Sequence, residues 1–204
     1  MEHFLHLSSE KQHNIINAAL HSFGKNGYKK ASISDIAKAA GISKAMIFHY
    51  FGCKKTLYLY LIEVCANVMI EGVMSRLDKT ETDFFKRIRH ISEMKMLVVK
   101  EYPDLFTFME NMYFETDPEV MPEVQKMLSS SRENLDILQF FEGVDFSRFK
   151  DNIDPMVVIK VLLYFSEGCI KQKSQDGKMD IEAVMQEYDE CLNLFKNNFY
   201  KGGN

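Results

Sequence analysis

The sequence predicts an all-α protein built from an N-terminal three-helix domain and a C-terminal helical domain. Only four prolines and ten glycines occur in 204 residues, so positions that break helices are few. Apolar residues recur at intervals of three and four along most of the chain, and no segment alternates apolar and polar residues over the length of a strand. We expect about nine helices, with the two domains covering residues 1–53 and 54–204.

The composition is that of an ordinary globular protein, with 46% apolar and 26% charged residues. Because no run of about 18 apolar residues lacks charges, we expect no membrane span. The first ten residues lack the basic and apolar regions of a signal peptide. The four cysteines are widely spaced and form no CxxC pair. They are therefore expected to be reduced thiols in a cytoplasmic protein without a metal site.

Charge is distributed unevenly along the chain. Residues 1–55 contain eight lysines and three acidic residues, a net charge of +5, whereas the rest of the chain carries −9. A basic segment joined to an acidic body is typical of a nucleic-acid-binding module attached to a second domain. Chance variation between two solvated surfaces could give the same net charges. The pattern of residues within the basic segment therefore has to show whether it binds nucleic acid.

The first helix is expected over residues 9–26. Its apolar stripe consists of Ile15, Ile16, Ala19, Leu20 and Phe23. Gly27 is expected to stop it in a left-handed conformation.

Two short helices, over residues 34–40 and 44–50, then flank Gly41. A sharp bend there requires positive φ, which glycine adopts without steric cost. Ser32 and Asp35 have the spacing of a capping box for the first short helix, and Ser43 can cap the second. Ala37 is small where the two helices cross. This pattern predicts a helix-turn-helix whose second helix faces outward and can enter a major groove about 12 Å wide.

The run from Asn14 to Leu57 resembles the DNA-binding domain of the TetR family of transcriptional regulators. The resemblance lies in three segments, Ile15–Tyr28, Ile33–Ser43 and Phe48–Lys54, and covers about a quarter of the chain. It implies a homeodomain-like helix-turn-helix domain followed by a helical domain for ligand binding and dimerisation.

The resemblance also implies roles for individual residues. Those expected to contact double-stranded DNA are Ser32, Ser43, Lys44, Ala45, His49, Tyr50 and Lys54. Ser32 and Ser43 could instead be helix caps alone, His49 a structural histidine and Tyr50 part of the core. Phe48 stands where the family commonly has tyrosine and has no hydroxyl to donate. We therefore expect it to pack, or to touch a thymine methyl, and not to bind phosphate.

The remaining helices are expected to cover six ranges: residues 54–77, 82–102, 103–114, 118–141, 155–174 and 180–200. Pro103 and Pro155 suit the first helical turn, and Asp154 and Asp180 can cap the helices that follow them. Residues 142–152 are expected to form a loop.

By the same resemblance, the middle helices would enclose a pocket for a small apolar effector. The candidate lining residues are Met94, Phe106, Met109, Glu110 and Tyr113. Flexible methionine thioethers suit an adaptable apolar cavity. The alternative is that these side chains are core residues and that no pocket exists.

The last two helices resemble the family's dimerisation helices. The candidate interface residues are Val161, Tyr164, Phe165, Gly168, Tyr188, Leu192 and Phe195. A dimer would also let two recognition helices read half-sites about 34 Å apart. The alternative is that both helices pack within one protomer.

Two functions remain open from the sequence. The first is a ligand-released repressor that binds a near-palindromic operator as a homodimer. The second is a DNA-bound scaffold of the same fold that recruits a protein partner and has no small-molecule effector. An enzyme is not expected, because the sequence has no nucleophile elbow, phosphate-binding glycine loop or HExxH motif, and no cofactor is expected.

Overall fold

A computed structural model describes residues 1–133, 135–173 and 181–202. Over these residues the chain is helical, with no strand, as expected; Ser174 and Asp180 lie outside the described residues. The chain forms two compact units. The first consists of Met1–Val73 and Lys95–Ser129, and the second of Met74–Met94 and Ser130–Asn204.

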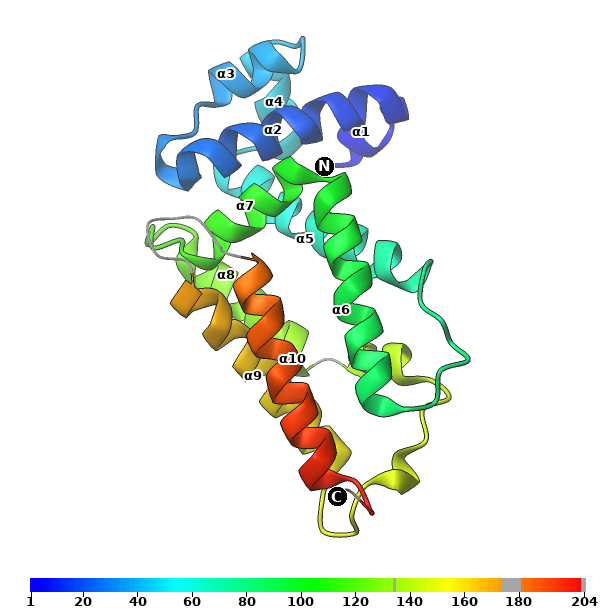
Figure 1. Cartoon of the computed structure of the whole chain (residues 1–204). Coiled ribbons are helices and arrows are strands. Elements are labelled where there is room, and N and C mark those ends of the chain that lie inside the picture. Colours follow the sequence, from blue (N-terminus) through cyan, green and yellow to red (C-terminus); the bar gives the residue numbers. More distant parts are fainter. Residues whose placement is uncertain (134, 174–180, 203–204) are drawn as a thin grey trace. The chain divides into compact units, whose positions relative to one another are not determined.

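The described residues form ten α-helices and two 3₁₀-helices, in agreement with the expected all-α fold of about nine helices. They are α1 (Glu2–Leu5), α2 (Ser9–Lys30), α3 (Ile33–Ala39), α4 (Lys44–Phe51), α5 (Lys54–Met74), α6 (Phe84–Glu101), α7 (Pro103–Tyr113), α8 (Met121–Glu133), η1 (Leu135–Phe141), η2 (Phe146–Arg148), α9 (Pro155–Lys173) and α10 (Ile181–Phe199) (Figure 1). α1 was not predicted from the sequence, and α8 and η1 were predicted as one continuous helix. Residues 142–152 were expected to form a loop, although η2 lies there.

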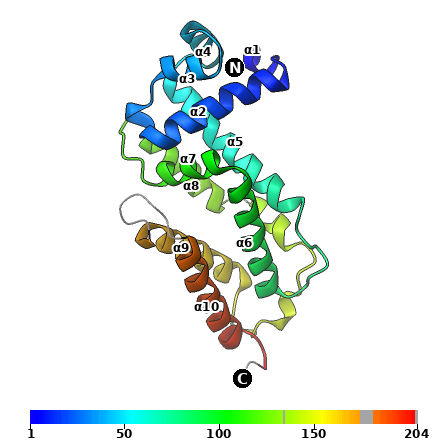
Figure 2. The ribbon, with the colours of Figure 1, turned by 45° about the horizontal axis from the view of Figure 1, so that its top comes forward.

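The three-helix head of the first unit consists of α2, α3 and α4, which Figure 2 shows from a second direction. Gly27 has φ +69° and interrupts α2 before its last residues, as expected of a glycine stop. Gly41 has φ +71° in the turn between α3 and α4. Both glycine predictions are confirmed.

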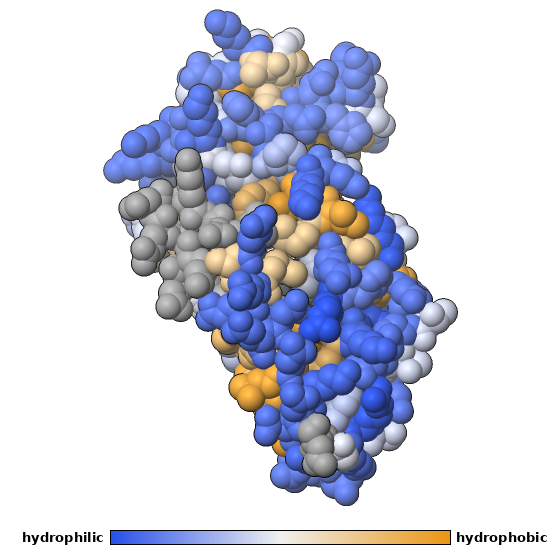
Figure 3. All heavy atoms as spheres, in the orientation of Figure 1, coloured by the Kyte–Doolittle hydropathy of each residue, from blue (hydrophilic) through white to orange (hydrophobic). Residues whose placement is uncertain are grey.

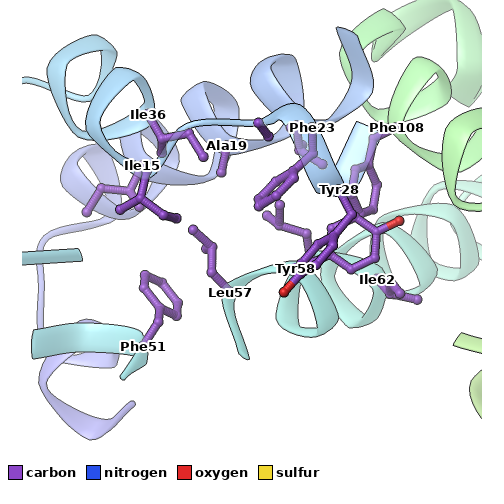
Figure 4. Packing of buried hydrophobic residues seen from close by; sticks show 14 of the residues in the cluster. Ile15, Ala19, Phe23, Tyr28, Ile36, Phe51, Leu57, Tyr58, Ile62 and Phe108 are labelled. Carbon is purple, nitrogen blue, oxygen red and sulfur yellow. The ribbon is translucent and has the colours of Figure 1, made fainter. Parts of the chain in front are cut away.

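The core of the first unit joins the head to α5 and α7 (Figure 4). The rings of Phe23, Tyr28 and Phe108 surround Tyr58, with centroids 5.1, 5.1 and 5.2 Å from its ring. Such edge-to-face arrangements stabilise a core beyond the area they bury. α1 contributes Phe4, which is fully buried.

α7 packs directly on α2 at a glycine. A Cβ atom on Gly24 would lie 3.0 Å from the backbone nitrogen of Phe108 and 3.3 Å from the carbonyl carbon of Thr107. The Asn111 amide donates to the Gly24 carbonyl oxygen, and His21 Nδ1 lies 3.1 Å from Asp104 Oδ1. Glycine is therefore required here by the close approach of two backbones.

By length and composition alone, α5 could cross a membrane, contrary to the expectation from the sequence that no segment could. Within the first unit, its residues Leu57, Tyr58 and Leu61 are buried in the core. Their burial accounts for the apolar composition of the first half of the helix.

The second unit is organised around an aromatic cluster and a buried arginine. The ring centroids of Phe84 and Phe149 lie 5.1 Å apart, as do those of Phe149 and Tyr200. Arg87 is fully buried and donates to four main-chain carbonyls, those of residues 79, 81, 140 and 142. It thereby ties the segment before α6 to the end of η1. α9 and α10 lie side by side (Figures 1 and 2).

Candidate DNA-binding helix-turn-helix

The two short helices of the head begin at the serines that the sequence identified. The Asp35 N–H donates to Ser32 Oγ over 3.3 Å, and the Met46 N–H donates to Ser43 Oγ over the same distance. Each hydroxyl satisfies one backbone donor that a helix start leaves without a partner. Both residues are therefore N-caps; Ser43 is exposed and Ser32 is half-buried.

The recognition helix candidate, α4, has one buried face and one exposed face. Ile47, Tyr50 and Phe51 are buried in the core of the unit. The exposed residues are Lys44, Ala45, Phe48 and His49. Three predicted DNA-contact residues, Lys44, Ala45 and His49, thus share one surface.

Tyr50 differs from the other predicted contacts because its side chain is only 6% exposed. Its ring lies 6.2 Å from that of Phe4 in an edge-to-face arrangement. The ring is therefore a core element, and any contact with phosphate is limited to what its hydroxyl can reach. The sequence had left the core alternative open for this residue.

His49 is held by a residue that the sequence did not single out. Its imidazole stacks on that of His3, with centroids 4.7 Å apart and planes inclined by 23°. His3 lies on α1, a helix of four residues that is too short to produce a periodic signal. The stack places His3 beside His49 at the exposed surface of α4.

Lys54 begins α5 and turns toward the end of α2. Its ammonium donates to the Lys29 carbonyl over 3.2 Å and lies 4.8 Å from the centre of the Tyr28 ring. Burial lowers the pKa of Lys54, and the carboxylates of residues 115, 117 and 119 oppose that shift. Lys54 therefore caps the C-terminal end of α2 through its hydrogen bond to the Lys29 carbonyl. Any phosphate contact would use the remaining donors of the same ammonium.

Next to Lys54, the exposed thiol of Cys53 lies 3.2 Å from Thr56 Oγ1. The hydrogen bonds from the Thr56 side chain and backbone N–H lower the pKa of Cys53, since both stabilise the thiolate. Cys65, buried in the core, is the opposite case, because burial raises its pKa to about 12.

The predicted effector residues fall into two groups. Phe106, Met109, Glu110 and Tyr113 share one half-buried face of α7 in the first unit, whereas Met94 lies in the part of α6 that belongs to the second unit. Glu110 Oε1 is buried and has no hydrogen-bond partner among the described residues. The face of α7 that packs on the core carries Leu105, Phe108 and Met112.

The predicted interface residues differ in how they are placed. Val161 and Tyr164 are 41% and 59% exposed on α9, and Gly168 is exposed as well. Phe165 and Tyr188 stack on each other within the unit, with centroids 6.3 Å apart, and Phe195 stacks on Phe199. Leu192 is only 1% exposed and lies in the interior of its own unit.

Comparison with known proteins places the head among bacterial regulators. Residues 15–61 match the family model described as bacterial regulatory proteins, tetR family. The chain is 19% identical over 181 residues to the biofilm operon icaADBC HTH-type negative transcriptional regulator IcaR of Staphylococcus aureus, covering 89% of this chain and 96% of IcaR. It is 27% identical over 116 residues to the HTH-type transcriptional activator FasR of Mycolicibacterium smegmatis, covering 57% of this chain and 52% of FasR.

Two solved structures agree with the fold. The fatty acid degradation regulator FadR of Bacillus halodurans superimposes with a TM-score of 0.67 at 21% identity, covering 88% of this chain and 96% of FadR. SmeT, the repressor of the Stenotrophomonas maltophilia multidrug efflux pump SmeDEF, gives a TM-score of 0.66 at 14% identity, over 96% and 94% of the two chains.

Proposed function

Because this chain belongs to the TetR family of bacterial DNA-binding transcriptional regulators, we propose that it is a cytoplasmic, non-enzymatic repressor. In this proposal it binds a near-palindromic operator as a homodimer and leaves it when a small apolar effector binds. The observation that carries the proposal is the exposed face of α4, which begins with the capping residue Ser43 and continues with Lys44.

The proposed contacts with DNA divide by chemistry. Lys44 donates to base edges or phosphate, and His49 donates to phosphate at the far end of α4. Ser32 and Ser43 use a lone pair in capping, so each hydroxyl proton is free to donate to a phosphate oxygen. Phosphate contacts fix the register of the helix, whereas base contacts give sequence preference.

Support for a homodimer comes from the exposed apolar residues of the second unit. Val157, Val161 and Tyr164 occupy one side of α9, and Leu194 is 60% exposed on α10. Figure 3 shows apolar surface exposed over this part of the chain. Large apolar residues exposed on two adjacent helices favour burial against a second copy.

Support for an effector comes from the half-buried face of α7. It combines apolar side chains with one carboxylate oxygen, Glu110 Oε1, that has no hydrogen-bond partner among the described residues. Few polar groups among apolar ones are typical of a ligand site. Such an effector would release DNA only by binding the released conformation more tightly than the DNA-bound one.

Repression is favoured over activation because the match to the negative regulator IcaR spans 89% of this chain, whereas the match to the activator FasR spans 57%. A reporter gene placed behind the bound DNA tests the direction. Expression that rises when the protein is removed agrees with repression, and expression that falls refutes it.

The central test is a gel shift with DNA from upstream of the protein's own gene, at two salt concentrations, against random DNA of equal length. We expect a sequence preference that persists at the higher salt concentration, because non-specific binding is mainly electrostatic. Equal affinity for both DNAs would refute the proposal.

Dimerisation is tested by Val161→Glu, with Leu97→Glu as a control of similar exposure on the other unit. We expect only the α9 variant to sediment as a monomer and to lose operator binding. Native mass spectrometry of the intact protein tests whether a small molecule is bound. A scaffold without an effector would carry no small molecule and would bind DNA constitutively.

A further inference from the structure

The exposed face of α4 contains two kinds of side chain. Lys44 and His49 carry nitrogen donors, whereas Ala45 and Phe48 present only carbon and hydrogen. The two apolar residues are three positions apart, so they are neighbours on one side of the helix. Half of the face thus offers no hydrogen bond to DNA.

Phe48 is the largest side chain on this face, and it is 40% exposed. A single exposed apolar residue is ordinary on a protein surface. The location is what matters here, because Phe48 lies on the exposed side of α4, one helical turn after Lys44 and directly before His49. Its ring is supported from one side by the Lys44 ammonium, 5.9 Å from the ring centre.

We propose that Phe48, with Ala45 beside it, determines specificity by contacting the C5-methyl group of thymine in the major groove. This inference rests on the proposed function, since it requires α4 to enter the groove. Base edges in that groove present hydrogen-bond donors, acceptors and one apolar group, the thymine methyl. A phenyl ring and an alanine methyl can recognise only the last of these.

The position of Lys44 adds a second expectation about the same half-site. Lys44 and Phe48 are one helical turn apart, a rise of about 6 Å along α4. Successive bases on one strand are about 3.4 Å apart. An ammonium that donates to guanine O6 or N7 would therefore place a guanine within about two base pairs of the thymine.

The experiment begins by selecting bound duplexes from a random DNA library with the full-length protein. The recovered duplex is then synthesised with deoxyuridine in place of each thymidine, one position at a time. Uracil pairs like thymine but lacks the C5-methyl group, so only the proposed contact is removed. Dissociation constants are measured for the wild-type protein, for Phe48→Ala and for Phe114→Ala.

Phe114 provides a matched control. It is a phenylalanine in the same unit with 39% exposure, and it lies outside α4 at the end of α7. Thermal unfolding of all three proteins checks that removing either exposed ring leaves the fold intact. A difference between the two variants then belongs to the position of the ring.

We expect one uracil substitution per half-site to weaken wild-type and Phe114→Ala binding about fourfold for each lost methyl contact. The Phe48→Ala protein should bind thymine and uracil duplexes equally at that position. If the selected duplex binds all three proteins well but uracil has no effect, the inference is overturned while the proposed function stands. The same conclusion follows if uracil weakens binding of Phe48→Ala as much as binding of the wild-type protein. A selection that yields no preferred sequence overturns the proposed function itself.

Discussion

Replacing Arg87 with methionine should destabilise the second unit far more than any surface substitution. The side chain is fully buried, and its two terminal nitrogens donate to four main-chain carbonyls. The shortest hydrogen bond to each of the two segments goes to the carbonyl of Glu81, at 2.5 Å, and to that of Phe140, at 2.9 Å. Methionine fills much of the same space but donates no hydrogen bond.

The magnitude follows from two opposing terms. A carbonyl left without a donor costs about 1–3 kcal/mol when it is buried; these four hydrogen bonds are part-buried, so losing them together should cost several kcal/mol. Removing the guanidinium also removes the cost of burying a charge, which offsets part of that loss. We therefore expect Arg87→Met to lower the free energy of unfolding by about 3–5 kcal/mol.

The assay is urea denaturation at fixed protein concentration, with Arg89→Met as the control. Arg89 lies on the same helix, but its ion pair with Asp189, at 2.8 Å, is at the surface. An exposed pair contributes about 0–1 kcal/mol. With a slope of about 2 kcal/mol/M, the midpoint should fall by about 1.5–2.5 M for the buried arginine and by less than about 0.5 M for the exposed one.

Equal urea midpoints for the two variants would refute this prediction, because the expected difference in stability comes from the burial of Arg87 and its four carbonyl acceptors. If Arg87→Met does not fold, Arg87→Lys tests the same point. An ammonium has three donors and no planar fork, so it should recover part of the stability.

Three further predictions concern the first unit. Lys54→Ala should weaken binding to all DNA sequences and reduce the slope of log affinity against log salt by about one; an unchanged slope would make Lys54 a structural cap alone. Iodoacetamide should label Cys53 near neutral pH, because its pKa is lowered and the labelling rate should rise at a lower pH than for an ordinary thiol. Cys65, whose pKa is raised to about 12, should react only after unfolding. Peptide mass spectrometry distinguishes the two labelled cysteines. Gly24→Ala should cost about 1–3 kcal/mol in thermal unfolding, since the new Cβ lies 3.0 Å from the Phe108 nitrogen; a gain in stability, as helix propensity alone would give, contradicts this.

Local chemistry explains which parts of the head were predictable. Ser32, Gly41 and Ser43 act through their own backbone and its next few residues, so their roles follow from spacing alone. The structure confirms both caps and the positive φ of the turn. The buried stripe of α2 was also visible, because a long amphipathic helix repeats its signal several times.

The missing features depend on contacts between distant segments. Two of the four carbonyl acceptors of Arg87 belong to Phe140 and Glu142, more than fifty residues later, so its burial could not be inferred from the neighbouring sequence. α1 is a single turn, whose stability comes from burying Phe4 and not from a repeating pattern. In α9, apolar residues occur on most sides, so spacing alone did not show that Tyr164 is exposed. In α10, apolar residues form one stripe, but the spacing did not show that Leu192 on that stripe is buried within its own unit.

The contact of α2 with α7 at Gly24 has a mechanical consequence. Most helix pairs are separated by side chains, which can change rotamer and absorb a small displacement. Here backbone meets backbone, and neither main chain can yield without moving as a whole. α7 carries the half-buried face of Phe106 and Glu110, and α2 is the first helix of the DNA-binding head. At this contact, a displacement of α7 toward α2 therefore requires the main chain of α2 to move with it.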